Sequence, residues 1–311
     1  MSITRTTLLG GPAAATFNGH TFFAHDGILV TPALELDAVD SDAEGALDAT
    51  VSGGPVTIQF TPSAPFADLI ALYPYMIGTP GTPLFGSADT PLVLVAANGT
   101  RLTFSATAIV EMPDLTLGAR EPVAGAVTFL AIGARSMPIS AANRLVGIDT
   151  AAVPLAPSTM PQLADDFEIT WGIAPWLKLR SRDGVKVHFA MKTSPVISAA
   201  NGLLDLTLDS LAVEVRFTPA TPDGPVEADI FNALGMQGGL PGRLVSAEAQ
   251  TLDVAGEHVW LRLPLARLTR GALMFDATHS RVGELVFTAG RALLGAESEA
   301  EALVSLTEGE P

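Results

Sequence analysis

The sequence predicts a mainly β protein built from two tandem β-sandwich or open-barrel domains, each with one flanking α-helix. Three observations predict this fold class: a long internal repeat, period-two alternation of apolar residues, and frequent turn signals containing Gly or Asn. Self-similarity at a steady offset indicates two copies of one unit. The 311 residues suffice for two domains of about 120–150 residues each, which is the usual size.

The repeat is clearest in two alternating segments that predict core strands. A run at 56–60 recurs at 213–217, both followed by Thr-Pro, with an offset of 217 − 60 = 157. A run at 125–129 recurs at 283–287, with an offset of 283 − 125 = 158. The matching residues are Val56, Ile58, Phe60, Gly125, Val127 and Phe129 in the first copy, and Val213, Val215, Phe217, Gly283, Leu285 and Phe287 in the second.

Turn signals extend the repeat. Asn18-Gly19 and Asp183-Gly184 each precede an alternating run and predict hairpin turns, because these residues accept positive φ at low cost. Asn98-Gly99 matches Ala255-Gly256, and the runs that follow match Leu102, Phe104 and Ala106 with Val259, Leu261 and Leu263. The offset falls from 183 − 18 = 165 to 157, which predicts a longer segment in the first copy at about 37–45.

One helix is expected in each copy, directly after the Thr-Pro. The first covers 66–73 and ends at Pro74, and the second covers 226–234 and is capped by Gly235. The predicted organisation is a first domain at 10–133, a Pro-rich linker at 134–169, a second domain at 170–293 and an acidic tail at 294–311. The tail is expected to be a short helix or a packing arm.

The composition excludes several classes of function. The formal net charge is −16, with 17 basic against 33 acidic residues, so no basic stripe for nucleic-acid binding is expected. There are no cysteines, which excludes disulfides, thiolate metal sites and cysteine nucleophiles. No apolar stretch is long enough for a membrane span, and the N-terminus does not read as a signal peptide, so we expect a protein made in the cytoplasm.

The sequence offers no constellation typical of catalysis or of cofactor binding. The five histidines are not spaced as metal ligands, which favours surface or cross-strand roles. The segment 40–45 opens like a calcium loop, but Val51 stands at the twelfth position, where a bidentate Glu belongs. No nucleophile elbow, phosphate-binding loop or dinucleotide fingerprint is present. We therefore expect no enzyme activity, no cofactor and no metal.

The stretch from the first helix onward resembles the major tail protein, or tail tube protein, of long-tailed (siphovirus-type) bacteriophages. The resemblance covers about 55–131 most closely and is weaker over the second copy, where Arg270-Gly271 stands in place of Met112-Pro113. The segments that carry it are Leu72-Tyr73-Pro74-Tyr75, Gly78, Pro83-Leu84-Phe85-Gly86, the run 89–94, Asn98-Gly99, Leu102-Thr103-Phe104, the run 112–117 and the run 125–129.

The resemblance implies a β-sandwich with a flanking helix, a structural role without catalytic residues, and rings that stack into a hollow tube for DNA passage. With a duplicated domain, three chains supply six similar positions around each ring. The implied partners are further copies of the chain, tail terminator and distal tail proteins, and the tape measure protein and DNA in the lumen, without specific binding and without a membrane. The implied location is the virion tail, assembled in the host cytoplasm.

The acidic segment from 37 to 48 is the candidate contact between rings, as a long hairpin or as a plain exposed loop. Its candidate contact residues are Asp37, Asp40, Asp42, Glu44 and Asp48. Two other functions stay open at this point: a distal tail or baseplate-hub protein that forms a single ring, and a monomeric cell-surface adhesion module.

Overall fold

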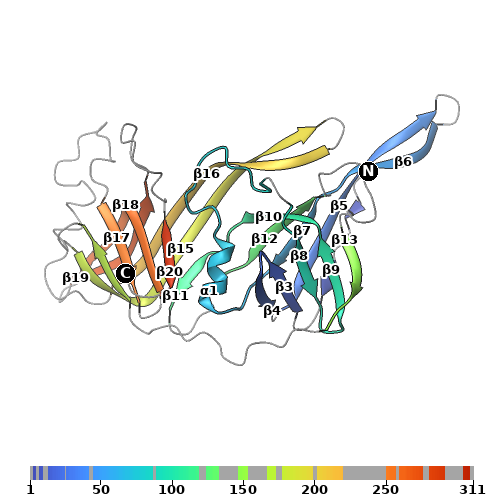
Figure 1. Ribbon diagram of the computed structural model, residues 1–311. Helices are drawn as coiled ribbons and strands as arrows, with labels where there is room; N and C mark the ends of the chain where they lie inside the picture. Colours follow the sequence, from blue (N-terminus) through green and yellow to red (C-terminus); the bar gives the residue numbers. More distant parts are fainter. Residues whose placement is uncertain are drawn as a thin grey trace.

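The computed structural model confirms a mainly β fold with several antiparallel sheets and one short helix (Figure 1). It describes residues 3–4, 7–9, 13–24, 26–41, 45–86, 89–118, 124–132, 146–152, 167–172, 177–198, 202–219, 250–256, 259–275, 280–290 and 304–308. We call residues 3–152 the first half of the chain and residues 167–308 the second half. One buried hydrophobic core runs through both halves.

The first half folds into two sheets. One has the order β1-β5-β7-β12-β10, with β2 and β6 also paired to β5, and the other has the order β13-β9-β8-β3-β4. In the larger sheet the strands are β1 (Ile3–Thr4), β2 (Thr7–Leu9), β5 (Ile28–Ser41), β6 (Gly45–Gly53), β7 (Val56–Phe60), β10 (Ala106–Glu111) and β12 (Val127–Ile132). In the smaller they are β3 (Ala13–Phe17), β4 (His20–Ala24), β8 (Leu92–Val95), β9 (Thr100–Phe104) and β13 (Val146–Thr150).

In the second half, hydrogen-bonded strand pairs close into a ring. β14 pairs with β15, β15 with β16, β16 with β19, β19 with β18, β18 with β17, and β17 pairs with β14 again. The pairing is that of a closed barrel, in which each strand of the ring has a partner on both sides over part of its length. The strands are β14 (Glu168–Trp171), β15 (Leu177–Ser198), β16 (Gly202–Pro219), β17 (Gln250–Ala255), β18 (Val259–Phe275), β19 (Ser280–Ala289) and β20 (Ser305–Glu308).

Strand pairing follows the same plan in both halves. β12 pairs with β7 and β10, while β19 pairs with β16 and β18. A register shift follows Ile109 in β10 and Leu268 in β18, and each of these residues faces the central Phe of its half, Phe129 or Phe287. Such a bulge bends a strand locally, so the two sheets bend at corresponding points.

The same aromatic cluster lies at the centre of each half. Phe60 stacks on Phe129 with ring centroids 5.9 Å apart, and Phe217 stacks on Phe287 at the same separation. A third ring meets the central Phe edge-on, at 5.0 Å in the first half and 5.5 Å in the second. These third rings are Phe17 and Trp171. Edge-on and offset contacts of this kind stabilise a core beyond the area that they bury.

The predicted first helix is present but short. α1 (Phe66–Leu69) continues as the 3-10 turn η1 (Ile70–Leu72), and Pro74 follows the terminal Tyr73, where it cannot continue a helix. Phe66, Leu69 and Leu72 are buried, so the helix is held by its apolar face. The second predicted helix, 226–234, lies outside the described residues.

The two predicted hairpin turns differ in outcome. Asn18-Gly19 does join β3 to β4, and both residues have positive φ. The prediction for Asp183-Gly184 is wrong, because these residues lie within the single strand β15, which has a register shift between Ser181 and Val185. Gly184, with φ +83°, allows the bend there while its backbone passes close to another strand.

The predicted insertion at 37–45 is also wrong. Gly27, with φ +88°, precedes β5 as Gly184 precedes Val185, an offset of 184 − 27 = 157. Val30 pairs with Ile58 and Val187 with Val215, again 157 apart. The hairpins that follow therefore have the same length in the two halves. The drop in offset came from matching Gly184 to Gly19 rather than to Gly27.

A second alignment slips by two residues. Leu94 pairs with Leu102, while Val254 pairs with Leu261, so Leu102 corresponds in pairing to Leu261 rather than to Val259. A slip of two leaves the inward-facing set of a strand unchanged, which is why the sequence pattern did not reveal it.

The predicted linker and tail both contain strands. β13, inside the expected linker 134–169, pairs with β9, and β14 begins at Glu168, before the expected second domain. β20, inside the expected tail, pairs with β18, so the packing-arm alternative holds for Ser305–Glu308. Both segments are short and polar, and long-range pairing holds them in place where local sequence signals do not.

Candidate assembly interface

The two halves meet where β11 (Leu115–Leu117), the loop at 78–86 and Tyr73, directly after η1, contact β15 and β16 of the second half (Figure 1). α1 is fixed at its start by Asp68, whose Oδ1 lies 2.8 Å from His20 Nδ1 on β4. Beyond η1, the Met76 carbonyl accepts a hydrogen bond from the Val304 amide, at 3.3 Å. The helix therefore links a strand of the first half to the C-terminal segment.

The loop at 78–86 adds itself to β16 as an extra strand. Leu84 N donates to Leu206 O at 2.8 Å, Gly81 N donates to Leu208 O at 2.7 Å, and Leu208 N donates to Thr82 O at 2.9 Å. The Phe85 amide also donates to Asp205 Oδ1 at 3.0 Å. This loop, which is rich in Gly and Pro, therefore forms an edge contact that is defined by backbone hydrogen bonds rather than by side-chain identity.

β11 (Leu115–Leu117) belongs to the first half in sequence but pairs with β15 of the second. Leu115 and Leu117 are fully buried, as are their partners Val187 and Val185. Burial of such side chains contributes about 1.5–3 kcal/mol each. A Cβ on Gly184 would lie only 2.5 Å from Leu117 O, so glycine is required for this close approach.

Aromatic side chains fill the junction above β11. Tyr73 lies 5.0 Å from Phe189 of β15 between ring centroids, and it is almost fully buried. Burial raises the pKa of the Tyr73 phenol well above its usual value, and the nearby Asp114 carboxylate raises it further. Burial, with Asp205, raises the pKa of Tyr75 in the same way, and Tyr75 OH donates to Leu84 O at 3.1 Å.

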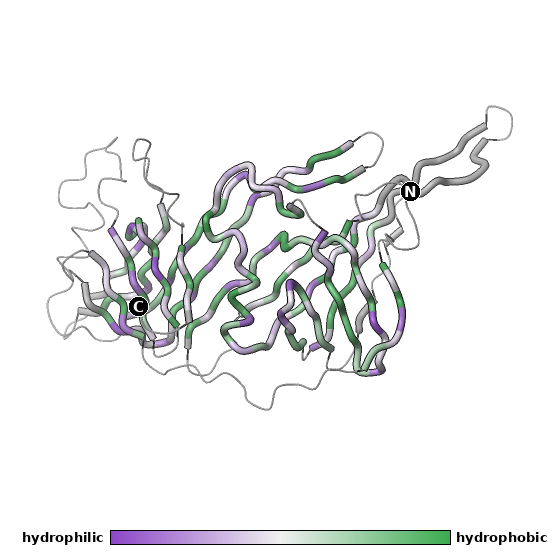
Figure 2. Tube along the Cα trace, in the orientation of Figure 1, coloured by the Kyte–Doolittle hydropathy of each residue, from purple (hydrophilic) through white to green (hydrophobic). Residues whose placement is uncertain are grey.

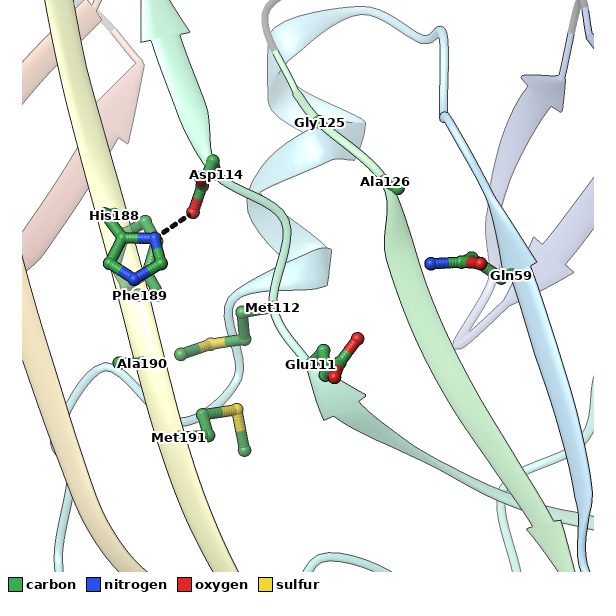
Figure 3. A pocket seen from close by; sticks show the side chains of 10 residues that line it. All are labelled: Gln59, Glu111, Met112, Asp114, Gly125, Ala126, His188, Phe189, Ala190 and Met191. Atoms are coloured by element: carbon green, nitrogen blue, oxygen red, sulfur yellow. Dashed lines mark hydrogen bonds and ion pairs between the residues drawn. The ribbon is translucent and has the colours of Figure 1, made fainter.

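An open pocket of about 450 Å³ lies at the same junction (Figure 3). His188 Nδ1 lies 2.7 Å from Asp114 Oδ1, an exposed side-chain contact that joins the two halves. Glu111 accepts a hydrogen bond from Thr128 Oγ1 at 2.7 Å. The pocket is lined by residues from both halves of the chain. They are Gln59, Glu111, Met112, Asp114, Gly125, Ala126, His188, Phe189, Ala190 and Met191.

A long hairpin projects from each half, and Figure 1 shows both extending toward the same side of the molecule. The first is β5–β6, where Asp37 pairs with Thr50, Asp40 with Ala46 and Val39 with Asp48. The described residues 37–41 and 45–48 therefore pair as the two strands of a hairpin. Strands flank it where an EF-hand calcium loop would have helices. Of the candidate contact residues, Asp37, Asp40 and Asp48 lie on this hairpin, whereas Asp42 and Glu44 lie outside the described residues.

The second hairpin, β15–β16, carries exposed apolar side chains near its tip. Val196 is 40% exposed and Ile197 is 68% exposed. Figure 2 shows this hydrophobic stretch close to the end of β15. The sequence held a signal for it, because two consecutive apolar residues on a strand point to opposite faces and one hairpin cannot bury both. The more exposed of the two, Ile197, makes the end of this projecting hairpin a candidate contact surface.

Among the described residues, no group of three His, Asp or Glu side chains lies close enough together to hold a metal ion. In the part of the chain that the structure describes, no helix is both long and apolar enough to cross a membrane. In comparisons with known proteins, the sequence matches no family model and no curated protein.

Proposed function

We propose that this protein is a structural component of a bacteriophage tail, and that it polymerises into stacked rings that form the hollow tail tube for DNA. The proposal starts from the sequence resemblance of 55–131 to tail tube proteins. In this proposal the two halves are copies of one domain, and each chain supplies two like positions to a ring of three chains.

The observation that carries the proposal is the common plan of the two halves. They share strand pairing, bulge position and aromatic cluster, and β11 and the loop at 78–86 hold them side by side. Two like units that pack heterologously within one chain can continue the same contact to the next chain, and a closing rotation then gives a ring.

The projecting hairpins support stacking. Both extend to one side of the molecule (Figure 1), so a ring would present its hairpins on one face, toward the next ring. Stacking of this kind is open-ended and forms a tube. The acidic composition suits a lumen through which DNA slides without adhering, because like charges repel.

Electron microscopy of the purified protein tests the proposal. We expect tubes, and cryo-EM reconstruction should resolve three chains per ring with pseudo-sixfold symmetry. Six chains per ring would refute the trimeric arrangement. Single rings would favour a distal tail or baseplate-hub protein, and monomers at high concentration would favour an adhesion module and refute self-assembly.

A further inference from the structure

We infer that neighbouring chains in the ring join by β-sheet pairing, with the end of β18 of one chain on β5 of the next. The pairing segments are Leu273–Phe275 and Ile28–Val30. In the isolated chain the N-terminal strand β2 holds this place on β5, so ring formation requires β2 to leave it. The inference rests on the proposed ring and names the surfaces that close it.

The acceptor is identified by its likeness to β15. Residues 29–30 of β5 pair on one side with β7, and the corresponding residues 186–187 of β15 pair on one side with β16 in the same register. On the opposite side, β15 carries β11, with Leu117 against Val185. The same side of β5 carries β2, with Leu9 against Ile28. β2 therefore occupies on β5 the place that β11 occupies on β15. The difference is that β2 comes from the same half as its partner strand, whereas β11 comes from the other half.

The donor is identified by its likeness to β11. Leu115 of β11 bridges to Ala124, and Leu273 of β18 pairs with Val282, with a common offset of 273 − 115 = 282 − 124 = 158. The end of β18 thus corresponds in pairing to β11. Beside Leu273–Phe275, the described residues place β19 on one side and no strand on the other.

The donor and the acceptor lie at opposite ends of the molecule. Figure 1 shows β18 and β19 at the left end and β5 at the right end, with the junction of the halves between them. A contact from one end of a chain to the other end of the next is heterologous and generates a ring when it closes. If the contact between two chains repeats the contact between the two halves of one chain, the end of β18 lies on residues 28–30 of the next chain.

The exchange of strands on β5 is physically reasonable because it conserves backbone hydrogen bonds. β2 has three residues, and three residues at the end of the 17-residue β18 replace them. One strand leaves as an equal length of strand arrives, so the net free energy comes from the further surface that the two chains bury. A three-residue edge strand is a suitable placeholder, since short edges pair weakly and prevent premature association.

Disulfide trapping tests the inference, because the chain has no cysteine of its own. The test variant is Leu29→Cys with Met274→Cys, which the inferred register places opposite each other. The matched control is Thr116→Cys with Lys186→Cys, which face each other within one chain. Directly opposed residues on antiparallel strands come close enough for a disulfide after a small adjustment. After mild oxidation of assembled protein, we expect covalent dimers and trimers from the test variant and only monomers from the control on non-reducing gels.

A truncation that removes residues 1–9 tests the placeholder role. We expect the truncated test variant to cross-link faster at equal protein concentration than the full-length test variant, with circular dichroism confirming an intact β fold. Slower cross-linking would show that β2 stays on β5 in the ring and would overturn the exchange.

Microscopy of the same samples separates the inference from the proposed function. Tubes that form without Leu29–Met274 cross-links would overturn the inferred contact and leave the tube function standing. Protein that neither assembles nor cross-links would overturn both.

Discussion

At the scale of single residues, two glycines in the same backbone conformation differ in what surrounds them. Gly19 and Gly184 both have φ +83°, but a Cβ meets nothing within 4 Å at Gly19 and lies 2.5 Å from Leu117 O at Gly184. We expect Gly19→Ala to lower the free energy of unfolding by about 1–2 kcal/mol, the cost of a left-handed backbone. Gly184→Ala should lower it by about 1–3 kcal/mol more, because it forces β11 from β15. Urea denaturation of both variants measures the difference, and equal losses would contradict the close approach.

Two buried tyrosines provide a second matched pair. Tyr75 OH donates to a carbonyl, whereas Tyr73 OH is buried and finds no partner among the described residues. We expect Tyr75→Phe to cost about 1 kcal/mol of stability and Tyr73→Phe to gain about 1 kcal/mol, because it removes a desolvated hydroxyl. Denaturation curves of the two variants measure both effects. The same sign for both would contradict this assignment.

The raised pKa values of these tyrosines also predict how the stability of the native state depends on pH. Each phenol ionises near pH 10 when unfolded but only at higher pH when folded, so the native state binds more protons above about pH 10. Stability therefore falls as the pH rises through this range. The chain has only two tyrosines, so absorbance near 295 nm reports them directly. We expect no phenolate signal from native protein at about pH 10.5, and ionisation of roughly three quarters of the phenols after denaturation at the same pH.

At the scale of elements, the hairpin β15–β16 carries the exposed Ile197, and we expect it to contact the next ring. Ile197→Asp should abolish long tubes but leave rings and fold intact, because a charge in an apolar contact is costly. Ile148→Asp is the control, because Ile148 is 72% exposed on β13 and lies off the projecting hairpin. Negative-stain microscopy compares tube lengths. Normal tubes from Ile197→Asp would show that this hairpin does not mediate stacking.

The elements that the sequence predicted well are those specified locally. The alternation of apolar residues predicted β7, and Asn18-Gly19 predicted the turn of the β3–β4 hairpin. Both signals are local, because side-chain periodicity and backbone preference act within a few residues. β11, β13 and β20 could not be foreseen, since each is a short strand whose partner lies far along the chain. The turn predicted at Gly184 was wrong because a glycine with positive φ is found in β-bulges as well as in hairpin turns.

The candidate interface was predictable only in part. The acidic segment 37–48 was recognisable as a hairpin candidate from its sequence. The contact of Tyr73 with Phe189, and the pairing of the loop at 78–86 with β16, join residues more than 100 positions apart. No periodicity in either segment encodes the other. Backbone hydrogen bonds carry much of this contact, and they leave little trace in side-chain pattern.

At the scale of the whole molecule, the net charge of the proposed tube determines whether its wall attracts or repels DNA. A ring of three chains carries 3 × (−16) = −48 formal charges. Acidic residues outnumber basic ones by 33 to 17, and four of the described arginines pair with carboxylates. These pairs are Arg101–Asp149, Arg216–Glu214, Arg262–Asp253 and Arg270–Glu284. The lumen should therefore be neutral or negative.

We expect double-stranded DNA to remain in the supernatant when assembled tubes are pelleted at about 50 mM salt, where phosphate contacts are strongest. DNA pelleted without tubes is the control. Co-pelleting that disappears as salt is raised would reveal a basic surface and would contradict a role for acidity in DNA passage.

The position of β11 in the chain has a consequence for biosynthesis. Its partner on β15 is translated 187 − 117 = 70 residues later. At about 5–20 residues per second, the ribosome exposes β11 without its partner for roughly 4–14 s. During that interval β11 lacks its partner, and transiently unpaired strand edges are prone to association with other chains. Each half expressed separately would lack this pairing, so the two halves are best regarded as a single folding unit.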